Sequence, residues 1–99
     1  MVTSRPNRAL AELVPLGGWD AGPAPGWVRC PVEVVAVWPI PGETDLLSPS
    51  VGRRLTAMLR HERTQELPLN QHWRVEARLA GPQLLRVLAI SDQGEPVVP

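Results

Sequence analysis

The sequence predicts a small antiparallel β-barrel or sandwich with long loops. Three observations lead to this fold class: several segments alternate apolar and polar residues with the period of a strand, no segment shows a clear helical pattern, and two long loops are rich in Pro and Gly. The chain has 99 residues, including 12 Pro and 8 Gly. A chain of this length holds one domain, so we expect residues 1–99 to form a single barrel.

The first segments give one expected strand and two irregular stretches. Residues 1–8 have no periodic pattern and are expected to form a loose N-terminal arm. Residues 9–16 alternate as a strand does, although Asn7 could instead cap a short helix there. Pro15 and the glycines after it end this segment too early for a stable helix, which favours the strand. Residues 17–26 contain four Gly and two Pro and are expected to form a loop.

The most apolar segment of the chain, residues 27–38, is expected to be a largely buried strand. It contains a β-branched run, with Pro31 at its entrance and Pro39 as its stop. Residues 39–53 then form a second long loop, which carries three Pro and two Gly and whose first fourteen residues hold only the charges of Glu43 and Asp45. Connections of this length in a small domain are usually functional or disordered, so we expect a projecting loop here.

The second half of the chain predicts three further strands. Residues 54–60 place Leu55, Ala57 and Leu59 on one face, and residues 72–79 alternate without a fault. A turn at 80–83 joins residues 73–79 to a strand at 84–90, so these two are expected to form a hairpin, preceded by a polar loop at 61–71. Residues 92–96 are expected to form another turn, after which Val97 and Val98 could add a short edge pairing.

Composition excludes several classes of protein. Ten basic residues, all Arg, balance ten acidic residues, and this neutrality argues against a generic binder of nucleic acid or anionic membranes. No apolar run approaches the length of a membrane span, and the first residues lack a signal-peptide pattern. With Cys30 as its single cysteine, the chain forms no internal disulfide, which fits a reducing, cytoplasmic-type compartment.

The side chains available for catalysis are few, and we expect no catalytic, cofactor-binding or metal-binding residues. His61 and His72 lack the spacing that presents two metal ligands together, and His72 lies at an outward position of its strand. His61 and Glu62 could act as an acid–base pair, but no nucleophile or metal site accompanies them. Cys30 precedes the most apolar strand and is expected to be a buried, inert thiol. An enzyme is therefore not expected.

The aromatic and basic residues are the candidates for interaction. Trp38 and Trp73 lie in strands and are expected to fill the core, since the chain has no Phe or Tyr. Trp19 and Trp27 flank the first loop. The sequence allows two functions for them, packing at a hinge or contact with a partner. The Arg residues could track phosphate groups, but the interspersed Glu62, Glu66 and Glu76 favour a solvated face or pairing between subunits. The possible interface residues are Trp19, Trp27, Arg54, Arg60, Arg74 and Arg78.

Several short stretches, taken in order, match a known pattern. Gly26 and Trp27 form a "GW" pair, the next strand ends in Val37-Trp38, and Pro39-Ile40-Pro41-Gly42-Glu43 opens the long loop. Residues 54–60, 69–75 and 81–92 follow in the places of three further strand motifs, the last reading GPQLLRVLAISD. In this order residues 25–92 resemble the head–tail joining proteins of long-tailed bacteriophages, also called head-closure, stopper or adaptor proteins.

The resemblance implies a virion structural protein of the phage neck, made in the cytoplasm of the host bacterium. In that family a small β-barrel subunit assembles into a homo-oligomeric ring between the portal with its adaptor and the tail, and the ring helps to retain packaged double-stranded DNA without reading its sequence. By analogy, the long loop would project toward the ring channel as a plug or a contact with the neighbouring ring. The residues so implied are Pro39, Ile40, Pro41, Gly42, Glu43, Thr44, Asp45, Leu46 and Leu47.

Two other functions remain open from the sequence. A small barrel could bind single-stranded nucleic acid through its Arg-bearing faces, with Trp73 or Trp27 as a stacking platform. A third possibility is an accessory protein whose β-domain binds a protein partner. None of the three readings involves a cofactor or a membrane.

Overall fold

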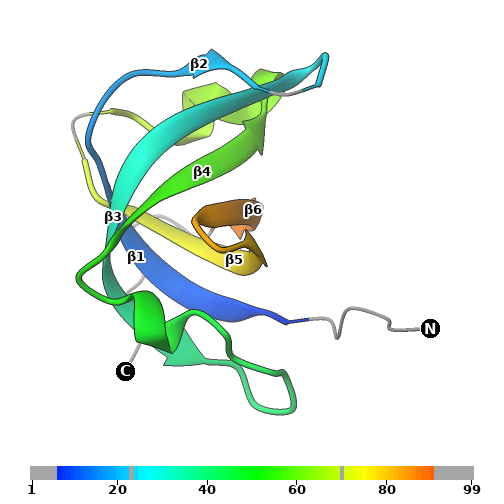
Figure 1. The fold of residues 1–99 in the computed structure, drawn as a ribbon. Helices are drawn as coiled ribbons and strands as arrows, with labels where there is room; N and C mark the ends of the chain where they lie inside the picture. Colours follow the sequence, from blue (N-terminus) through cyan, green and yellow to red (C-terminus); the bar gives the residue numbers. More distant parts are fainter. Residues whose placement is uncertain (1–6, 23, 70, 91–99) are drawn as a thin grey trace.

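The longest strand, β3 (Trp27–Pro39), organises the fold, because it pairs with a different strand at each end (Figure 1). In this computed structural model, which describes residues 7–22, 24–69 and 71–90, the first half of β3 pairs with β4 (Arg54–Arg60) and its second half with β1 (Ala9–Pro15). The β1–β3 register shifts after Glu12, which leaves Val35 as an extra residue on β3. Such a bulge bends a strand and increases its twist, and this lets β3 curve around the core.

The remaining pairings close the barrel. β1 also pairs with β5 (Trp73–Gly81), β5 with β6 (Leu84–Ile90) and β6 with β4, so the order β1-β5-β6-β4-β3 returns to β1. The short strand β2 (Asp20–Ala21) pairs with the start of β3, within the segment that the sequence indicated as a loop. The expected β-barrel is confirmed, and the alternative of a sandwich is not formed.

One pair of strands differs from the all-antiparallel prediction. β4 and β6 run parallel, with Thr56 opposite Leu84 and Met58 opposite Arg86. The expected hairpin of β5 and β6 is present and antiparallel. β6 is the strand of this hairpin that lies beside β4, while β5 lies beside β1. In this position β6 runs in the same direction as β4. The prediction was wrong for this pair because alternation along a strand carries no information about the direction of its partner.

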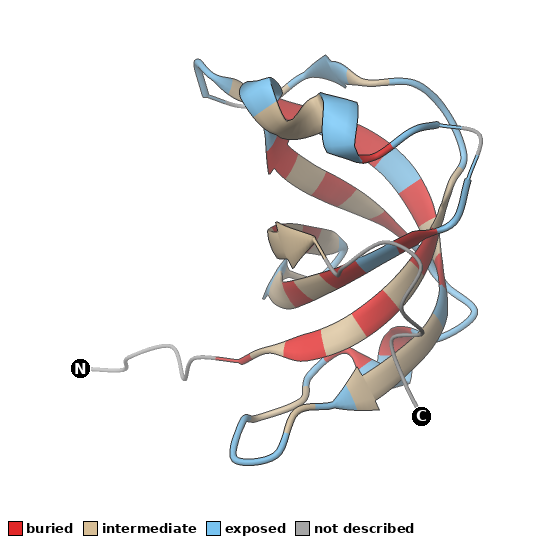
Figure 2. Cartoon of the chain, turned by 180° about the vertical axis from the view of Figure 1, so that it is seen from behind, coloured by how far each residue is buried: buried red, intermediate tan, exposed pale blue. Residues whose placement is uncertain are grey.

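The core lies inside the barrel, where inward positions of all five barrel strands meet. Figure 2 shows buried residues alternating with less buried ones along the strands. This alternation confirms the inward faces predicted for residues 54–60 and 73–79. The fully buried side chains of largest volume are Trp73, Leu13, Leu47, Leu59, Leu85, Val32, Val34, Val75 and Cys30.

Pro31 lies within β3 rather than at its entrance. On one edge of β3, Arg29 pairs with β2 and Val32 pairs with β1, and Pro31 lies between these two pairings. Proline cannot donate a backbone hydrogen bond, so a strand tolerates it where the pairing on one edge is interrupted. The Pro31 carbonyl still accepts a hydrogen bond of 2.8 Å from the N–H of Leu16.

Two short 3-10 helices occur where the sequence predicted loops. η1 (Ser48–Ser50) lies in the loop between β3 and β4, and η2 (His61–Glu66) directly follows β4. The residue after η2, Leu67, is 2% exposed and belongs to the core, so the segment 61–71 is not a purely polar loop. Helices of one or two turns lack the repeat of apolar residues by which longer helices are recognised.

The N-terminal strand is confirmed, but the loose arm was predicted too long. Residues 1–6 lie outside the described residues, whereas Asn7 is 6% exposed. Its side-chain amide accepts a hydrogen bond of 2.8 Å from the Leu79 N–H and donates one of 3.1 Å to the Leu79 carbonyl. The amide therefore pairs with β5 as a strand residue would, and extends the β1–β5 ladder by one step. The predicted turn at 92–96 and the pairing of Val97 and Val98 lie outside the described residues.

Candidate functional site

The loop between β3 and β4 begins with a tight turn. The Glu43 N–H donates a hydrogen bond of 3.0 Å to the Ile40 carbonyl, and Gly42 has φ of +84°. Pro41 followed by a Gly of positive φ is the signature of a type II turn. Pro41, Gly42 and Glu43 are exposed, so this turn forms the tip of the loop.

The base of the loop is fixed to the barrel. Gly52 donates a backbone hydrogen bond of 2.8 Å to the Val34 carbonyl, and Val34 donates one of 3.0 Å to the Arg53 carbonyl. Leu47 is fully buried in the core. Only the first half of the predicted projecting loop therefore extends from the barrel, and Leu47, which the resemblance placed among the channel residues, is a core residue instead.

Asp45 holds the middle of this loop in shape. Its carboxylate accepts hydrogen bonds from the backbone N–H groups of Leu47 (2.9 Å) and Ser48 (3.1 Å), and from the Ser48 hydroxyl. Burial alone would raise the pKa of Asp45, but these hydrogen bonds, with the Ser48 hydroxyl first among them, outweigh it and lower the pKa below its ordinary value. Asp45 is thus a structural residue of the loop, and its carboxylate is engaged by Leu47 and Ser48.

Arg8 ties the loop tip to the N-terminal segment. Its guanidinium forms ion pairs with Glu43 (3.2 Å) and Glu76 (2.9 Å), and its N–H donates a hydrogen bond of 2.9 Å to the Thr44 carbonyl. Glu43 therefore has a partner within the chain. The sequence did not indicate this contact, because it joins residues 35 positions apart.

The four tryptophans have different environments. Trp73 is 1% exposed and fills the core, as predicted, which excludes it as a stacking platform for bases. Trp19 packs against the core and stacks on Trp73. Trp38 is only partly buried and lies opposite Leu10, so its predicted core position was wrong. The reason is the bulge at Val35: it reverses the alternation, so that Val37 packs against the core and Trp38 points outward.

Trp27 forms the centre of a basic cluster. The guanidinium carbons of Arg60 and Arg86 lie over its ring, at 5.2 and 4.8 Å from the ring centroid. These distances are typical of cation–π contacts. Trp27 and Arg60 are directly opposite on β3 and β4, whereas Arg86 reaches the ring from β6.

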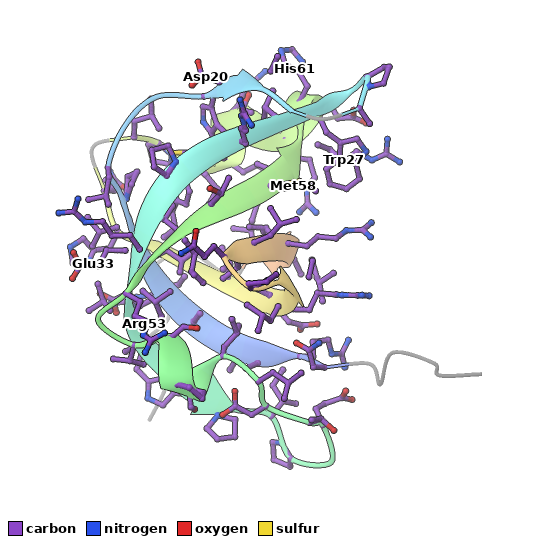
Figure 3. The ribbon with its side chains drawn as sticks, in the orientation of Figure 1. Asp20, Trp27, Glu33, Arg53, Met58 and His61 are labelled. Carbon is purple, nitrogen blue, oxygen red and sulfur yellow. The ribbon has the colours of Figure 1, made fainter. Side chains whose placement is uncertain are left out.

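The other predicted interface residues do not all join this cluster. Arg78 lies directly opposite Arg86 on β5, so it extends the cluster by one strand. Arg74 lies opposite Glu12, with 4.0 Å between its Nε and a carboxylate oxygen, and Arg54 lies opposite Glu33 at the far end of β4. Figure 3 shows Trp27 and Met58 on one side of the barrel and Glu33 and Arg53 on the other. The proposed set therefore divides between separate faces.

Two contributors to the cluster were not singled out from the sequence. Arg29 lies opposite Met58 on the outer face, and Met58 in turn lies opposite Arg86. The alternation along residues 27–38 indicates from the sequence alone that Arg29 points outward. The registers that align it with Arg86 and Arg78 were not, because they depend on how four strands pair.

Cys30, His72 and His61, the candidates for chemistry, lie in three different environments. Cys30 is fully buried, as predicted, and burial raises the pKa of its thiol above the ordinary value. His72 is exposed and contacts Glu12, with 2.6 Å between Nδ1 and a carboxylate oxygen. His61 begins η2, and its carbonyl accepts a hydrogen bond from the Thr64 hydroxyl. Within residues 7–22, 24–69 and 71–90, no three His, Cys, Asp or Glu side chains come together in a way that could hold a metal ion.

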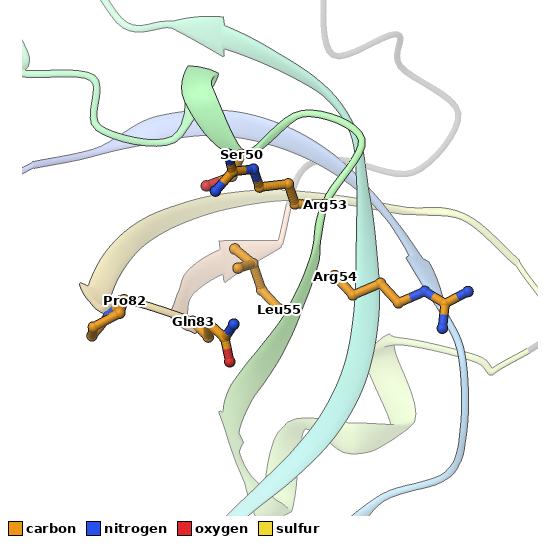
Figure 4. Close-up of a pocket in the computed structure, with 6 residues that line it drawn as sticks. All are labelled: Ser50, Arg53, Arg54, Leu55, Pro82 and Gln83. Carbon is orange, nitrogen blue, oxygen red and sulfur yellow. The ribbon is translucent and has the colours of Figure 1, made fainter.

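A shallow depression of about 500 Å³ lies between the start of β4 and the β5–β6 turn (Figure 4). Arg53, Leu55 and Gln83 are among its lining residues. Arg53 turns back toward Ser50, whereas Arg54 points away from the other lining residues (Figure 4). The lining offers two cations, Arg53 and Arg54, and the hydroxyl of Ser50, and it holds no carboxylate or imidazole.

Comparison of the chain with protein-family models, with curated proteins and with solved structures gave no match in any of the three. None of the helices in the described part of the chain has the length and apolarity needed to span a membrane. The inference of function therefore depends on the residues themselves.

Proposed function

We propose that the protein is a structural subunit of a phage neck, which forms a homo-oligomeric ring with the portal or adaptor on one side and the tail on the other. The proposal joins the resemblance of residues 25–92 to head–tail joining proteins with the architecture of the chain. In this role the chain works by fitting other proteins, and its location is the virion. The small closed barrel supports the proposal because it supplies a rigid body on which loops can be presented.

The observation that carries the proposal is the form of the loop between β3 and β4. Its base is held by Leu47 in the core and by the hydrogen bonds of Val34, while its tip at Pro41–Glu43 is exposed. A loop with a fixed base and an exposed tip presents the same contact surface in every copy of a ring. A ring multiplies such contacts, because each subunit holds its neighbours in register.

Exposed apolar side chains beside this loop support contact with neighbouring subunits. Val35, Leu46 and Val51 are 39%, 43% and 46% exposed. Val35 and Val51 are chain neighbours of Val34 and Gly52, which are joined by a backbone hydrogen bond. We propose that this region and the loop tip form the subunit contact, and that Glu43 faces the channel only where its ion pair with Arg8 opens.

The proposal is tested by deleting the gene from the phage or prophage that encodes the chain and examining the particles. We expect heads that package DNA, lose it and carry no tails, and we expect the chain in purified wild-type virions in ring-like copy number. Complementation with the wild-type gene restores infectious particles. A variant with Gly and Ser at positions 40–44 is expected to fold but to restore few tailed particles.

The matched control carries Gln71→Ser, which changes an exposed residue on a different segment and should complement fully. Thermal melting of both purified variants shows whether they fold. Normal tailed particles from the deletion, or absence of the chain from purified virions, would disprove the neck role. Full complementation by the 40–44 variant would disprove the assigned role of the loop tip.

A further inference from the structure

A continuous row of outward-facing residues crosses four strands of the barrel. The registers place Arg78 (β5) opposite Arg86 (β6), Arg86 opposite Met58 (β4), and Met58 opposite Arg29 (β3). Neighbouring strands lie about 4.8 Å apart, so the row spans about 15 Å. Trp27 and Arg60 lie one pair further along β3 and β4. We call Trp27, Arg29, Met58, Arg60, Arg78 and Arg86 the basic face.

The guanidinium groups of the basic face are not neutralised by carboxylates of the described residues. Among residues 7–22, 24–69 and 71–90, the ion pairs to arginine involve Arg8, Arg63 and Arg74, and none involves Arg29, Arg60, Arg78 or Arg86. Asp20 lies opposite Arg29 without forming an ion pair. The chain is neutral as a whole, so this face concentrates positive charge locally.

The arrangement within the face is unfavourable in the isolated subunit. Arg78 and Arg86 are directly opposite on antiparallel strands, and like charges in such a pair destabilise a sheet. The Nε of Arg78 is buried and has no hydrogen-bond partner in the described part of the chain. An anion placed over this pair would relieve the repulsion and accept hydrogen bonds from both guanidinium groups.

Trp27 holds part of this charge in place. Arg60 and Arg86 both lie over its ring, which restricts two flexible side chains before any ligand binds. Beside them lies a depression of about 310 Å³, lined by Trp27, Arg60, Arg63, Arg86, Glu62, Leu59, Val87 and Leu88. Arg63 is already paired with Glu66, so Arg60 and Arg86 supply the unpaired positive charge there, and Glu62 is the one carboxylate among the described lining residues.

We propose that the basic face binds the phosphodiester backbone of nucleic acid without reading its bases. Guanidinium groups suit phosphate oxygens, and an aromatic ring within a basic groove is a common feature of such surfaces. An acidic face on a second copy is less suitable as the occupant. Several described carboxylates are already engaged: Glu12 with His72, Glu43 and Glu76 with Arg8, and Glu66 with Arg63.

This inference goes beyond the neck role and does not depend on it, since binding is measured on the isolated chain. The probes are fluorescein-labelled 20-nucleotide DNAs of mixed sequence, one single-stranded and one duplex, with anisotropy measured from 25 to 200 mM NaCl. We expect a Kd on the order of 10⁻⁵ M at low salt, little dependence on sequence, and a log–log salt slope of about −3 for duplex. The two probes show which form of the backbone is preferred.

The test variant is Arg78→Gln with Arg86→Gln, and the matched control is Arg53→Gln with Arg54→Gln, which removes two charges from the opposite side of the barrel. We expect the test variant to bind at least about tenfold more weakly, with a salt slope reduced by about two, and the control to stay within about twofold. Thermal melting confirms that both variants fold.

Three outcomes would overturn the proposal. The first is no binding of either DNA at 25 mM NaCl, and the second is an equal loss of affinity in the two double variants. The third is competition by polyglutamate as effective as competition by unlabelled DNA of equal charge, which would indicate an acidic protein as the partner. Each of these results leaves the neck assembly experiment unaffected, so the two proposals fail separately.

Discussion

The indole rings of Trp19 and Trp73 are stacked, with their centroids 5.2 Å apart and their planes 3° from parallel. Trp73 also donates a hydrogen bond of 2.7 Å from Nε1 to the Pro68 carbonyl. One side chain therefore joins the core of the barrel to two connecting segments, the one before β2 and the one before β5.

We predict that Trp73→Phe destabilises the protein by about 1–3 kcal/mol, because it removes the Nε1 hydrogen bond to the Pro68 carbonyl and takes ring volume out of the core. Trp19→Leu should cost less, since Trp19 is only partly buried. In a double-mutant cycle with Trp73→Leu, the two residues should couple by about 0.5–1.5 kcal/mol. Guanidinium unfolding followed by circular dichroism measures all of these. Coupling indistinguishable from zero would mean that the stack contributes only buried area.

Asn7 should be as important for stability as a core residue. Both hydrogen bonds of its amide go to the backbone of Leu79, and the site is nearly closed to water. We expect Asn7→Ala to cost about 1–3 kcal/mol, because the N–H and the carbonyl of Leu79 in β5 both lose their partner. Asn7→Asp keeps the acceptor for the Leu79 N–H but sets a carboxylate oxygen against the Leu79 carbonyl, so its loss of stability in urea unfolding should be at least as large as that of Asn7→Ala. If Asn7→Ala melts at the wild-type temperature, water replaces the hydrogen bonds of the amide without loss of stability, and the prediction is wrong.

The Asp45 carboxylate should make the loop between β3 and β4 sensitive to acid. Its pKa is lower in the folded protein than in the unfolded chain, so the carboxylate stabilises the folded state at pH values above the ordinary aspartate pKa. This stabilisation is lost as the pH falls through the folded-state pKa. We expect Asp45→Ala to cost about 1 kcal/mol near pH 7, as the loss of a capping carboxylate does. The difference from wild type should shrink as the pH falls below about 4. A difference constant over that range would contradict the assignment.

Cys30 should control the alkaline stability of the fold. Burial raises the pKa of its thiol, so the folded state holds the thiol proton more tightly than the unfolded chain does. The resulting stabilisation of the folded state is present at pH values below the ordinary thiol pKa and is lost as the pH rises above it. The chain has no Lys and no Tyr, so few other groups titrate in this range. We expect stability to fall with a slope of up to about 1.4 kcal/mol per pH unit above about pH 8.5.

Cys30→Ala is the control for this prediction, because it removes the thiol while leaving every other titrating group in place. Its stability should be flat where that of wild type falls. In the folded wild-type protein, labelling by a thiol reagent at pH 8 should be slow and should become complete in denaturant. Rapid labelling of the folded protein would show that Cys30 is accessible.

The fold class could be predicted because the signals for it are local. Alternation in residues 54–60 and 73–79 fixes which side chains point inward, and the spacing of the last two strands indicates a hairpin. The placement of Trp38 could not be predicted in this way. A single extra residue at Val35 reverses the alternation, and the sequence carries no mark of a bulge within a β-branched run.

The candidate site was predicted less completely, for a related reason. The exposed tip of the loop follows from Pro41 and Gly42, which specify a turn by themselves. The burial of Leu47 and the row formed by Arg29, Arg86 and Arg78 depend instead on contacts between distant strands. Barrel closure and the parallel β4–β6 pair decide those contacts, and neither has a local signal.

Arg78 offers the last prediction, since it lies on a face that is unfavourable without a ligand. Arg78→Gln removes one of two directly opposed charges and a guanidinium whose Nε is buried without a partner. We expect this variant to be more stable than wild type by about 0.2–1 kcal/mol at low salt, and the gain to shrink as NaCl is added, since salt screens the repulsion. Arg54→Gln serves as the control, because Arg54 lies opposite Glu33 and its removal should gain nothing. A loss of stability in Arg78→Gln would show that the aliphatic part of Arg78 outweighs the repulsion, and that the row of arginines is part of the fold's own packing.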